Sequence, residues 1–248
     1  MNWDAVSWTI LGPALLAGLI VLSTHIPLGQ QVLQRGIVFI DLAVAQIAAL
    51  GVVLADTLGF EPQGLQVQVA AVVSALLGAL LLTWIEKKWP EVQEALIGAL
   101  FVLAASGSIL LLANNPHGGE HLKDLLAGQI LWVSPSQLLW GALVSAVILV
   151  AWFGFRERLG RAGFYVLFAL AVTVSVQLVG VYLVFSSLIM PALAVRAWQT
   201  HRRLLAGYAL GGVAYGLGLT LSGLFDLPAG AVTVWSLAAL GVVFSALA

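Results

Sequence analysis

The sequence predicts an all-α protein that crosses a membrane several times. Of its 248 residues, 61% are hydrophobic and only 8% are charged, and the mean hydropathy is +1.06. Soluble domains carry about 25% charged residues. The apolar residues form about nine runs, most of them near the roughly 20 residues that a spanning helix needs. We expect residues 1–248 to form a single transmembrane domain surrounded by membrane lipid.

Composition also excludes several classes of protein. The net charge of −1 gives no electrostatic basis for binding nucleic acid. The chain has no cysteine, so it can form neither a thiolate metal site nor a disulfide. It contains no GxxxxGK[ST] motif for nucleotide phosphates. We therefore expect that the chain is not an enzyme and that any ATP hydrolysis comes from another polypeptide.

The apolar runs place the helices along the chain. We expect helices at approximately 6–27, 36–58, 67–85, 92–113, 137–155, 163–179, 182–195, 204–224 and 229–247. The apolar stretch from Gly163 to Val195 is too long for one span and too short for two full ones. Gly180 near its middle and Pro191 near its end are the expected breaks. In the helix at 204–224, Gly207/Gly211 and Gly212/Gly216 have the spacing that favours close helix contact.

The basic residues predict the orientation. With the N-terminus outside and the C-terminus inside, all but one of the ten Lys and Arg residues lie on the cytoplasmic side, as the positive-inside rule favours. These residues are Arg35, Lys87, Lys88, Arg156, Arg158, Arg161, Arg196, Arg202 and Arg203. Only Lys123 falls on the outer side.

Two stretches carry a resemblance to a known family. Residues 177–183 read QLVGVYL and residues 187–196 read SLIMPALAVR. Together they resemble the signature of the permease subunits of zinc/manganese/iron ABC importers, and more distantly that of cobalamin and iron-siderophore permeases. Weaker matches occur at Glu94, Ile97 and Gly98 and over residues 222–230.

That resemblance implies a fold and a set of partners. The fold is the type II ABC importer permease fold, in the bacterial inner membrane. The implied partners are an ABC ATPase, a periplasmic or lipid-anchored metal-binding protein, and a second permease copy that is identical or closely related. The transported divalent ion would be zinc, manganese or iron, and the sequence leaves these three open.

The resemblance also assigns a coupling surface. After Pro191 the family leads into a short coupling helix that docks on the ATPase, here at about 192–203. The residues implied are Pro191, Ala192, Ala194, Arg196, Arg202 and Arg203, with Glu94 on another inner turn as a further candidate. The alternative is a kinked helix with a basic end and no partner, and for Glu94 an ordinary helix start.

Asp41 is the first candidate ligand for the transported metal. A carboxylate inside an apolar span is costly unless it meets a polar cavity or a partner. In the family an Asp and a His four residues apart line the metal route, but here Gln46 takes the place of the His and Leu42 that of the Asp. Asp41 and Gln46 diverge by about 140° on a regular helix, so they share a site only if the helix is distorted or the site spans a dimer. The alternative is a buried Asp bonded to a neighbouring helix.

The expected outer loop 114–136 holds a second, weaker candidate. Its HGGEH sequence places His117, Glu120 and His121 close together, where they could bind metal at the entrance. Pro116 and the glycine pair oppose the helix that a metalloprotease of the HxxEH class requires. The alternative is a plain polar loop that contacts a binding protein.

Two other functions fit the sequence less well than an ABC permease. An ion-gradient-driven secondary transporter would use Asp41 as its titrating group, but such proteins usually carry several intramembrane charges. An intramembrane enzyme would need histidines and an acid gathered within the bilayer, and here the histidines are scattered. The sequence therefore favours the ABC permease.

Overall fold

The computed structural model describes residues 7–61, 64–112, 126, 128 and 130–246, and every regular element among them is a helix. The elements are α1 (Trp8–Arg35), α2 (Ile40–Thr57), α3 (Leu65–Lys88), η2 (Pro90–Val92), α4 (Gln93–Leu112), η3 (Ile130–Trp132), α6 (Pro135–Val179), α7 (Val181–Ala194), α8 (Thr200–Phe225) and α9 (Ala229–Ala246). Within these residues, 8 helical stretches are long and apolar enough to cross a membrane, and α7 is a shorter apolar helix. The predicted polytopic, all-helical architecture is confirmed.

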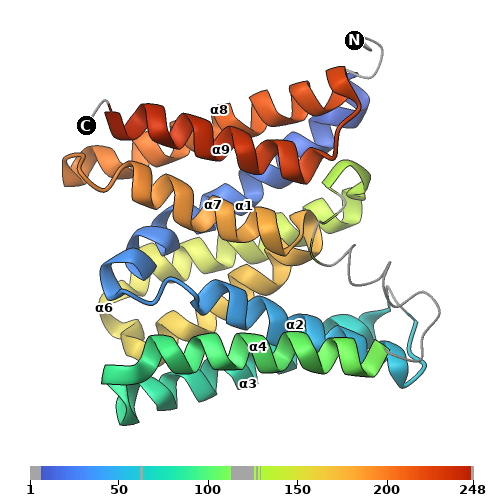
Figure 1. The fold of residues 1–248 in the computed structure, drawn as a ribbon, viewed down its shortest axis with the longest axis vertical. Helices are drawn as coiled ribbons and strands as arrows, with labels where there is room; N and C mark the ends of the chain where they lie inside the picture. Colours follow the sequence, from blue (N-terminus) through green and yellow to red (C-terminus); the bar gives the residue numbers. More distant parts are fainter. Residues whose placement is uncertain (1–6, 62–63, 113–125, 127, 129, 247–248) are drawn as a thin grey trace.

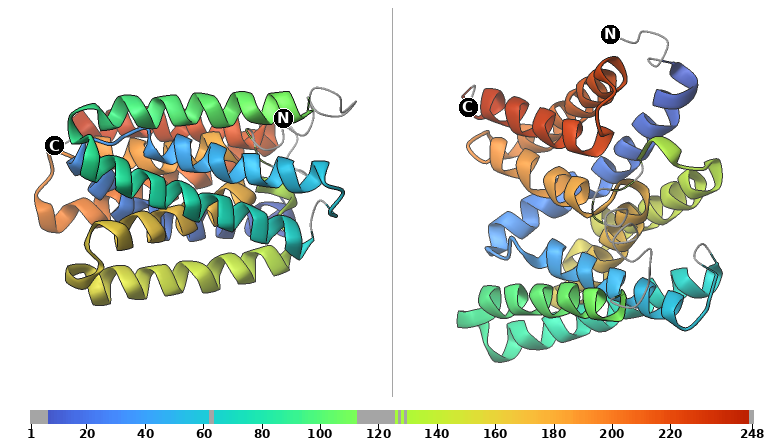
Figure 2. Two further views of the ribbon diagram at one scale, coloured as in Figure 1. Left: turned by 90° about the horizontal axis from the view of Figure 1, so that it is seen from below. Right: turned by 45° about the vertical axis from the view of Figure 1, so that its right-hand side comes forward.

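The helices form two groups that two further helices join. In Figure 1, α2, α3 and α4 lie together on one side, and α7, α8 and α9 lie together on the other. The helix α1 packs on α6, α7 and α8, while α6 also packs on α3, so these two helices connect the groups. Most of the axes run along one common direction, as the left view in Figure 2 shows. This direction is the one in which the chain would cross a membrane.

The boundary between the first two helices differs from the prediction. The first helix does not end near residue 27 but continues to Arg35, and Gly36, with φ 70°, ends it by donating its N–H to the carbonyls of Leu33 and Val32. Proline inside a membrane helix is tolerated when neighbours cover the freed carbonyl, and Pro27 is buried within α1. The second helix therefore begins at Ile40, several residues later than expected.

A sharp bend divides α6 into two spans. The backbone leaves helical geometry at Phe155 (φ −126°, ψ 16°) and at Gly160 (φ 57°, ψ −159°). The two spans are Pro135–Phe155 and Arg158–Val179. The inner loop predicted between the fifth and sixth helices is thus a kink in which helical turns continue.

Basic side chains from distant parts of the sequence gather at one end of the bundle. Glu86 Oε1 lies 3.9 Å from Arg35 Nη1 and 3.6 Å from Arg161 Nε, so α1, α3 and α6 meet there. The guanidinium of Arg35 also lies 4.2 Å from the centre of the Phe164 ring. The turn between α7 and α8 lies at the same end, on the left of Figure 1, near the C-terminus. The positive-inside rule would assign this end to the cytoplasm, so the orientation stays a prediction from the basic residues.

Glycine contacts in α8 follow the prediction only in part. A Cβ added at Gly211 would lie 2.6 Å from Leu22 Cδ2, and one added at Gly207 would lie 2.9 Å from Ile26 Cγ2. The Gly207/Gly211 pair therefore packs closely on α1, as expected. A Cβ at Gly212 or Gly216 would meet no described atom within 4 Å. The prediction that another helix of this chain packs closely on this second pair was therefore wrong.

Candidate functional site

The break between α6 and α7 sets the shape of the site. Gly180 has φ 81° and ψ 163°, a backbone conformation that is essentially restricted to glycine. The predicted turn at Gly180 is therefore confirmed. The predicted break at Pro191 was wrong, because Pro191 is buried inside α7 and the helix continues to Ala194. A buried proline removes one backbone donor, and a neighbouring helix can cover the carbonyl that this leaves free.

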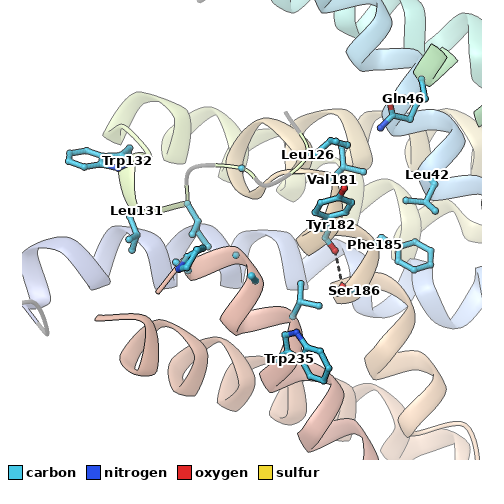
Figure 3. Close-up of a pocket in the computed structure, with 18 of the residues that line it drawn as sticks. Leu42, Gln46, Leu126, Leu131, Trp132, Val181, Tyr182, Phe185, Ser186 and Trp235 are labelled. Atoms are coloured by element: carbon cyan, nitrogen blue, oxygen red, sulfur yellow. Dashed lines mark hydrogen bonds between the residues drawn. The ribbon is translucent and has the colours of Figure 1, made fainter. Parts of the chain in front are cut away.

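A pocket of about 760 Å³ lies beside this break, between the two groups of helices. Its walls come from α2, α4, α7 and α9 and from the segment around η3. Much of the wall is aromatic: Phe101, Trp132, Tyr182, Phe185 and Trp235. Figure 3 shows Tyr182 and Phe185 side by side on α7 with Gln46 approaching from α2. Gln46 and Ser186 supply polar side chains, and Ser186 Oγ donates to the carbonyl of Tyr182 at 2.8 Å.

Gly128 lines the pocket and packs against the backbone at the break between α6 and α7. Its φ is 69°, and a Cβ added there would lie 2.2 Å from the carbonyl oxygen of Val179 and 2.6 Å from the nitrogen of Gly180. The backbone at Gly128 therefore rests directly on the junction between α6 and α7, where only a residue without a side chain fits. Within the predicted outer loop 114–136, the structure describes Leu126 as helical and residues 130–132 as the 3₁₀ turn η3, while residues 114–125, 127 and 129 lie outside the described part of the chain.

The structure does not bring Asp41 and Gln46 together. The helix α2 is regular, and Gln46 lines the pocket while Asp41 does not. Asp41 lies in the first turn of α2 and not in the middle of a span, and it is completely buried. Neither carboxylate oxygen has a hydrogen-bond partner among the described residues. The positive end of the helix dipole provides part of the stabilisation that a carboxylate needs there.

The other metal candidates are not assembled in the described part of the chain. No group of three or more His, Asp or Glu side chains that could hold a metal ion occurs among the described residues. The predicted ligands His117, Glu120 and His121 lie outside those residues, as does Lys123. His25 is buried in α1, where its Nδ1 lies 3.0 Å from the carbonyl oxygen of Val21.

The predicted coupling segment forms a turn and not a separate helix. Between Ala194 and Thr200, a stretch the structure describes in full, the chain makes turns and then enters α8 directly. The predicted segment 192–203 therefore comprises the end of α7, this turn and the first residues of α8. Trp198 stacks on Phe244 and donates its indole N–H to the carbonyl of Phe244 at 3.2 Å, which ties the turn to α9.

The residues predicted to contact the ATPase differ in their exposure. Arg196 and Arg202 are exposed at the basic end. Arg203 is half-buried, and its Nε donates to the carbonyl of Trp198 at 2.8 Å, so it holds the turn in shape. Pro191, Ala192 and Ala194 are buried in α7 and pack inside the chain.

Glu94 is also engaged within the chain. Its Oε1 accepts a hydrogen bond from the backbone N–H of Phe39 at 3.1 Å. Phe39 is the N-cap residue of α2 and has no side-chain cap of its own. Nearby, the Gln93 amide donates to the Tyr165 hydroxyl at 2.7 Å. The inner end of α4 therefore supports α2 and α6.

Sequence reasoning missed the pocket and the anchoring role of Glu86. The pocket is assembled from five segments, and no local pattern predicts that their aromatic residues meet. Glu86 could have been found by its position, because a carboxylate near the basic end of a membrane helix is expected to pair with the arginines at that end.

The fold and the surfaces described define a multi-pass membrane protein of the ABC importer permease type. The chain belongs to the ABC 3 transport family, whose model matches residues 7–161 and 154–248. Membership implies an ATPase and a substrate-binding protein as partners.

Three comparisons illustrate the relationship. The chain is 26% identical over 242 residues to the high-affinity zinc uptake system membrane protein ZnuB of Haemophilus influenzae, covering 89% of this chain and 91% of the relative. It is 26% identical over 253 residues to an uncharacterized membrane protein of Synechocystis sp., covering 93% of this chain and 88% of the relative. The solved structure of PsaBC from Streptococcus pneumoniae in complex with a Fab matches its fold with a TM-score of 0.76 at 22% identity, covering 94% of this chain and 90% of that one.

Proposed function

We propose that the chain is the permease subunit of a bacterial ABC importer that carries a divalent transition metal ion, zinc, manganese or iron, into the cytoplasm. The observation that carries the proposal is the family match along the whole described chain. The zinc uptake relative supports a metal as the substrate.

The complete transporter would contain several further parts. A second permease copy, identical or related, would complete the pathway in the inner membrane. A periplasmic or lipid-anchored protein would deliver the metal to the outer end. An ABC ATPase would dock on the turn at about 192–203, where Arg196 and Arg202 are exposed. This chain would contribute no ATP hydrolysis of its own.

Asp41 is the residue we propose to meet the metal inside the membrane. A buried carboxylate without a hydrogen-bond partner is costly to keep, and Asp41 has none among the described residues. Carboxylate oxygen is a ligand that zinc and manganese both accept. The outer residues His117, Glu120 and His121 remain a second, weaker proposal for a transient metal site at the entrance.

The experiment that tests this function is uptake of radioactive metal. Cells that lack the chain would be compared with cells that regain it, using labelled zinc, manganese and iron in turn. Accumulation of at least one of the three metals should depend on the chain and stop when cellular ATP is depleted. Equal accumulation of all three metals with and without the chain would overturn the proposal.

A further inference from the structure

We propose that the pocket between α7 and α2 binds the metal as a complex with an organic, carboxylate-bearing ligand, and not as the bare ion. This proposal rests on the function proposed above, because it takes metal import as given and names the chemical form of the metal. Three features of the pocket support it: an uncapped helix start, an amide side chain without a described hydrogen bond, and aromatic walls.

The first feature is the N-terminus of α7. No side chain caps this helix, and Val181 and Tyr182 of its first turn line the pocket. The N–H groups of Val181, Tyr182 and Leu183 have no hydrogen-bond partner among the described residues. Free N–H groups and the helix dipole together carry a partial positive charge. Such a helix end attracts carboxylate oxygens and repels a bare divalent cation.

The second feature is Gln46. Its side chain is only 3% exposed, lines the pocket, and makes no hydrogen bond with any described residue. In Figure 3 its amide points into the pocket, toward α7. The amide nitrogen and oxygen remain accessible from the pocket, so a ligand that offers oxygen acceptors to the NH₂ group would gain a hydrogen bond. Because Gln46 and the start of α7 line the same pocket, one ligand could contact both.

The third feature is the chemistry of the walls. None of the described residues that line the pocket is Asp, Glu or His, the side chains without sulfur that zinc prefers. The pocket is lined instead by the aromatic rings of Phe101, Tyr182, Phe185 and Trp235. The volume of about 760 Å³ lies in the range of about 300–1,000 Å³ that is typical of sites for organic molecules. These walls suit the flat, apolar part of an organic ligand.

The zinc complex of pyridine-2,6-dicarboxylate is a probe that matches these features. It has a planar ring for the aromatic walls and carboxylates for the N–H groups, with the metal held between them. The chain has no cysteine, so an Ala105→Cys variant places one thiol of this chain in the pocket and leaves Gln46 intact. The assembled transporter would be treated with a thiol reagent, and labelling would be read on the separated chain.

The expected result is that the zinc complex slows labelling of the Ala105→Cys variant at least tenfold, while zinc ion alone does not. A Ser136→Cys variant is the control, because Ser136 is exposed on α6 and does not line the pocket. Its labelling should not change with either addition. Protection by zinc ion alone, or no protection by the complex, would overturn the proposal. A thiol that never reacts would also overturn it, because the pocket would then be covered by lipid or by a second copy.

A dual-label uptake experiment separates this proposal from the function on which it rests. Cells would receive the complex carrying labelled zinc and ¹⁴C-labelled dicarboxylate in a buffer free of other chelators. Both labels should enter together, and Gln46→Leu should lower both at least tenfold, while Gln68→Leu on the exposed face of α3 should not. Entry of zinc without ¹⁴C would overturn the chelate proposal and leave metal import standing. Failure of zinc to enter in any form would overturn both.

Discussion

Glu94 on α4 holds the start of α2 through the backbone N–H of Phe39, with the two atoms 3.1 Å apart. The contact joins residues 55 positions apart in the chain. It gives α2 the capping acceptor that its own N-cap residue lacks. The same helix carries both Asp41 and Gln46, so Glu94 positions both candidate ligands.

Glu94→Ala should therefore lower stability by about 1 kcal/mol, the usual effect of losing a helix cap, while Glu94→Gln, which keeps an acceptor oxygen, should lower it less. The measurement is unfolding of the detergent-solubilised chain. Unchanged stability of Glu94→Ala together with loss of ATPase binding would instead support the coupling role that the sequence suggested.

Close packing of α1 on α7 gives a second prediction. A Cβ at Gly29 would lie 2.1 Å from the carbonyl oxygen of Leu188, which is backbone and cannot move aside easily. Gly29→Ala should destabilise the chain by about 1–3 kcal/mol, the usual cost of overpacking. The matched control is Gly212→Ala, also within a helix, where a Cβ meets nothing within 4 Å. That control should be neutral or stabilising by up to about 1 kcal/mol, because alanine favours helix. Equal effects of the two variants would contradict the packing described.

The contact of Gly128 with the junction between α6 and α7 gives a third prediction. Gly128 and Gly36 have nearly the same positive φ, 69° and 70°, but only Gly128 faces atoms within 4 Å. Gly36→Ala should therefore show the backbone cost alone, about 1–2 kcal/mol. Gly128→Ala should show that cost and a clash with Val179 as well. Unfolding of both variants in detergent measures the difference in the free energy of unfolding. A smaller loss of stability for Gly128→Ala than for Gly36→Ala would contradict the contact between Gly128 and Val179.

Asp41 gives a prediction about transport without a loss of structure. Asn has nearly the same shape as Asp but no negative charge to offer a cation. Asp41→Asn should abolish metal uptake while the chain still assembles with its ATPase, and its stability should not fall, because no described hydrogen bond is lost. Asp56→Asn, near the other end of α2, is the control and should transport normally. Normal uptake by Asp41→Asn would remove Asp41 from the mechanism.

Long apolar runs made the helices predictable, because a span in lipid must satisfy its own backbone hydrogen bonds. Gly180 was found as a break because its conformation needs glycine. Pro191 misled the prediction, because proline ends helices in water more reliably than in a bundle of membrane helices. The start of α2 could have been placed better from Arg35 followed by Gly36, a common helix ending.

The candidate site was less accessible to sequence reasoning. The divergence of Asp41 and Gln46 followed from helix geometry alone, and the structure agrees with it. That Gln46 meets the start of α7 in a pocket depends on packing between segments more than 130 residues apart, as the positions of Gln46 and Val181 show. The internal hydrogen bonds of Glu94 and Arg203 were equally hidden, because a charged residue at a helix end looks the same whether it faces another protein or its own chain.

Purification of the tagged chain from its own cells in mild detergent, with mass spectrometry of what accompanies it, tests the central claim most directly. An ABC ATPase should accompany the wild-type chain. It should be lost when Arg196 and Arg202 are both replaced by alanine, and retained when exposed Arg158 is replaced. A chain that purifies without any ATPase under several mild conditions would contradict the ABC permease and favour a transporter driven by an ion gradient through Asp41.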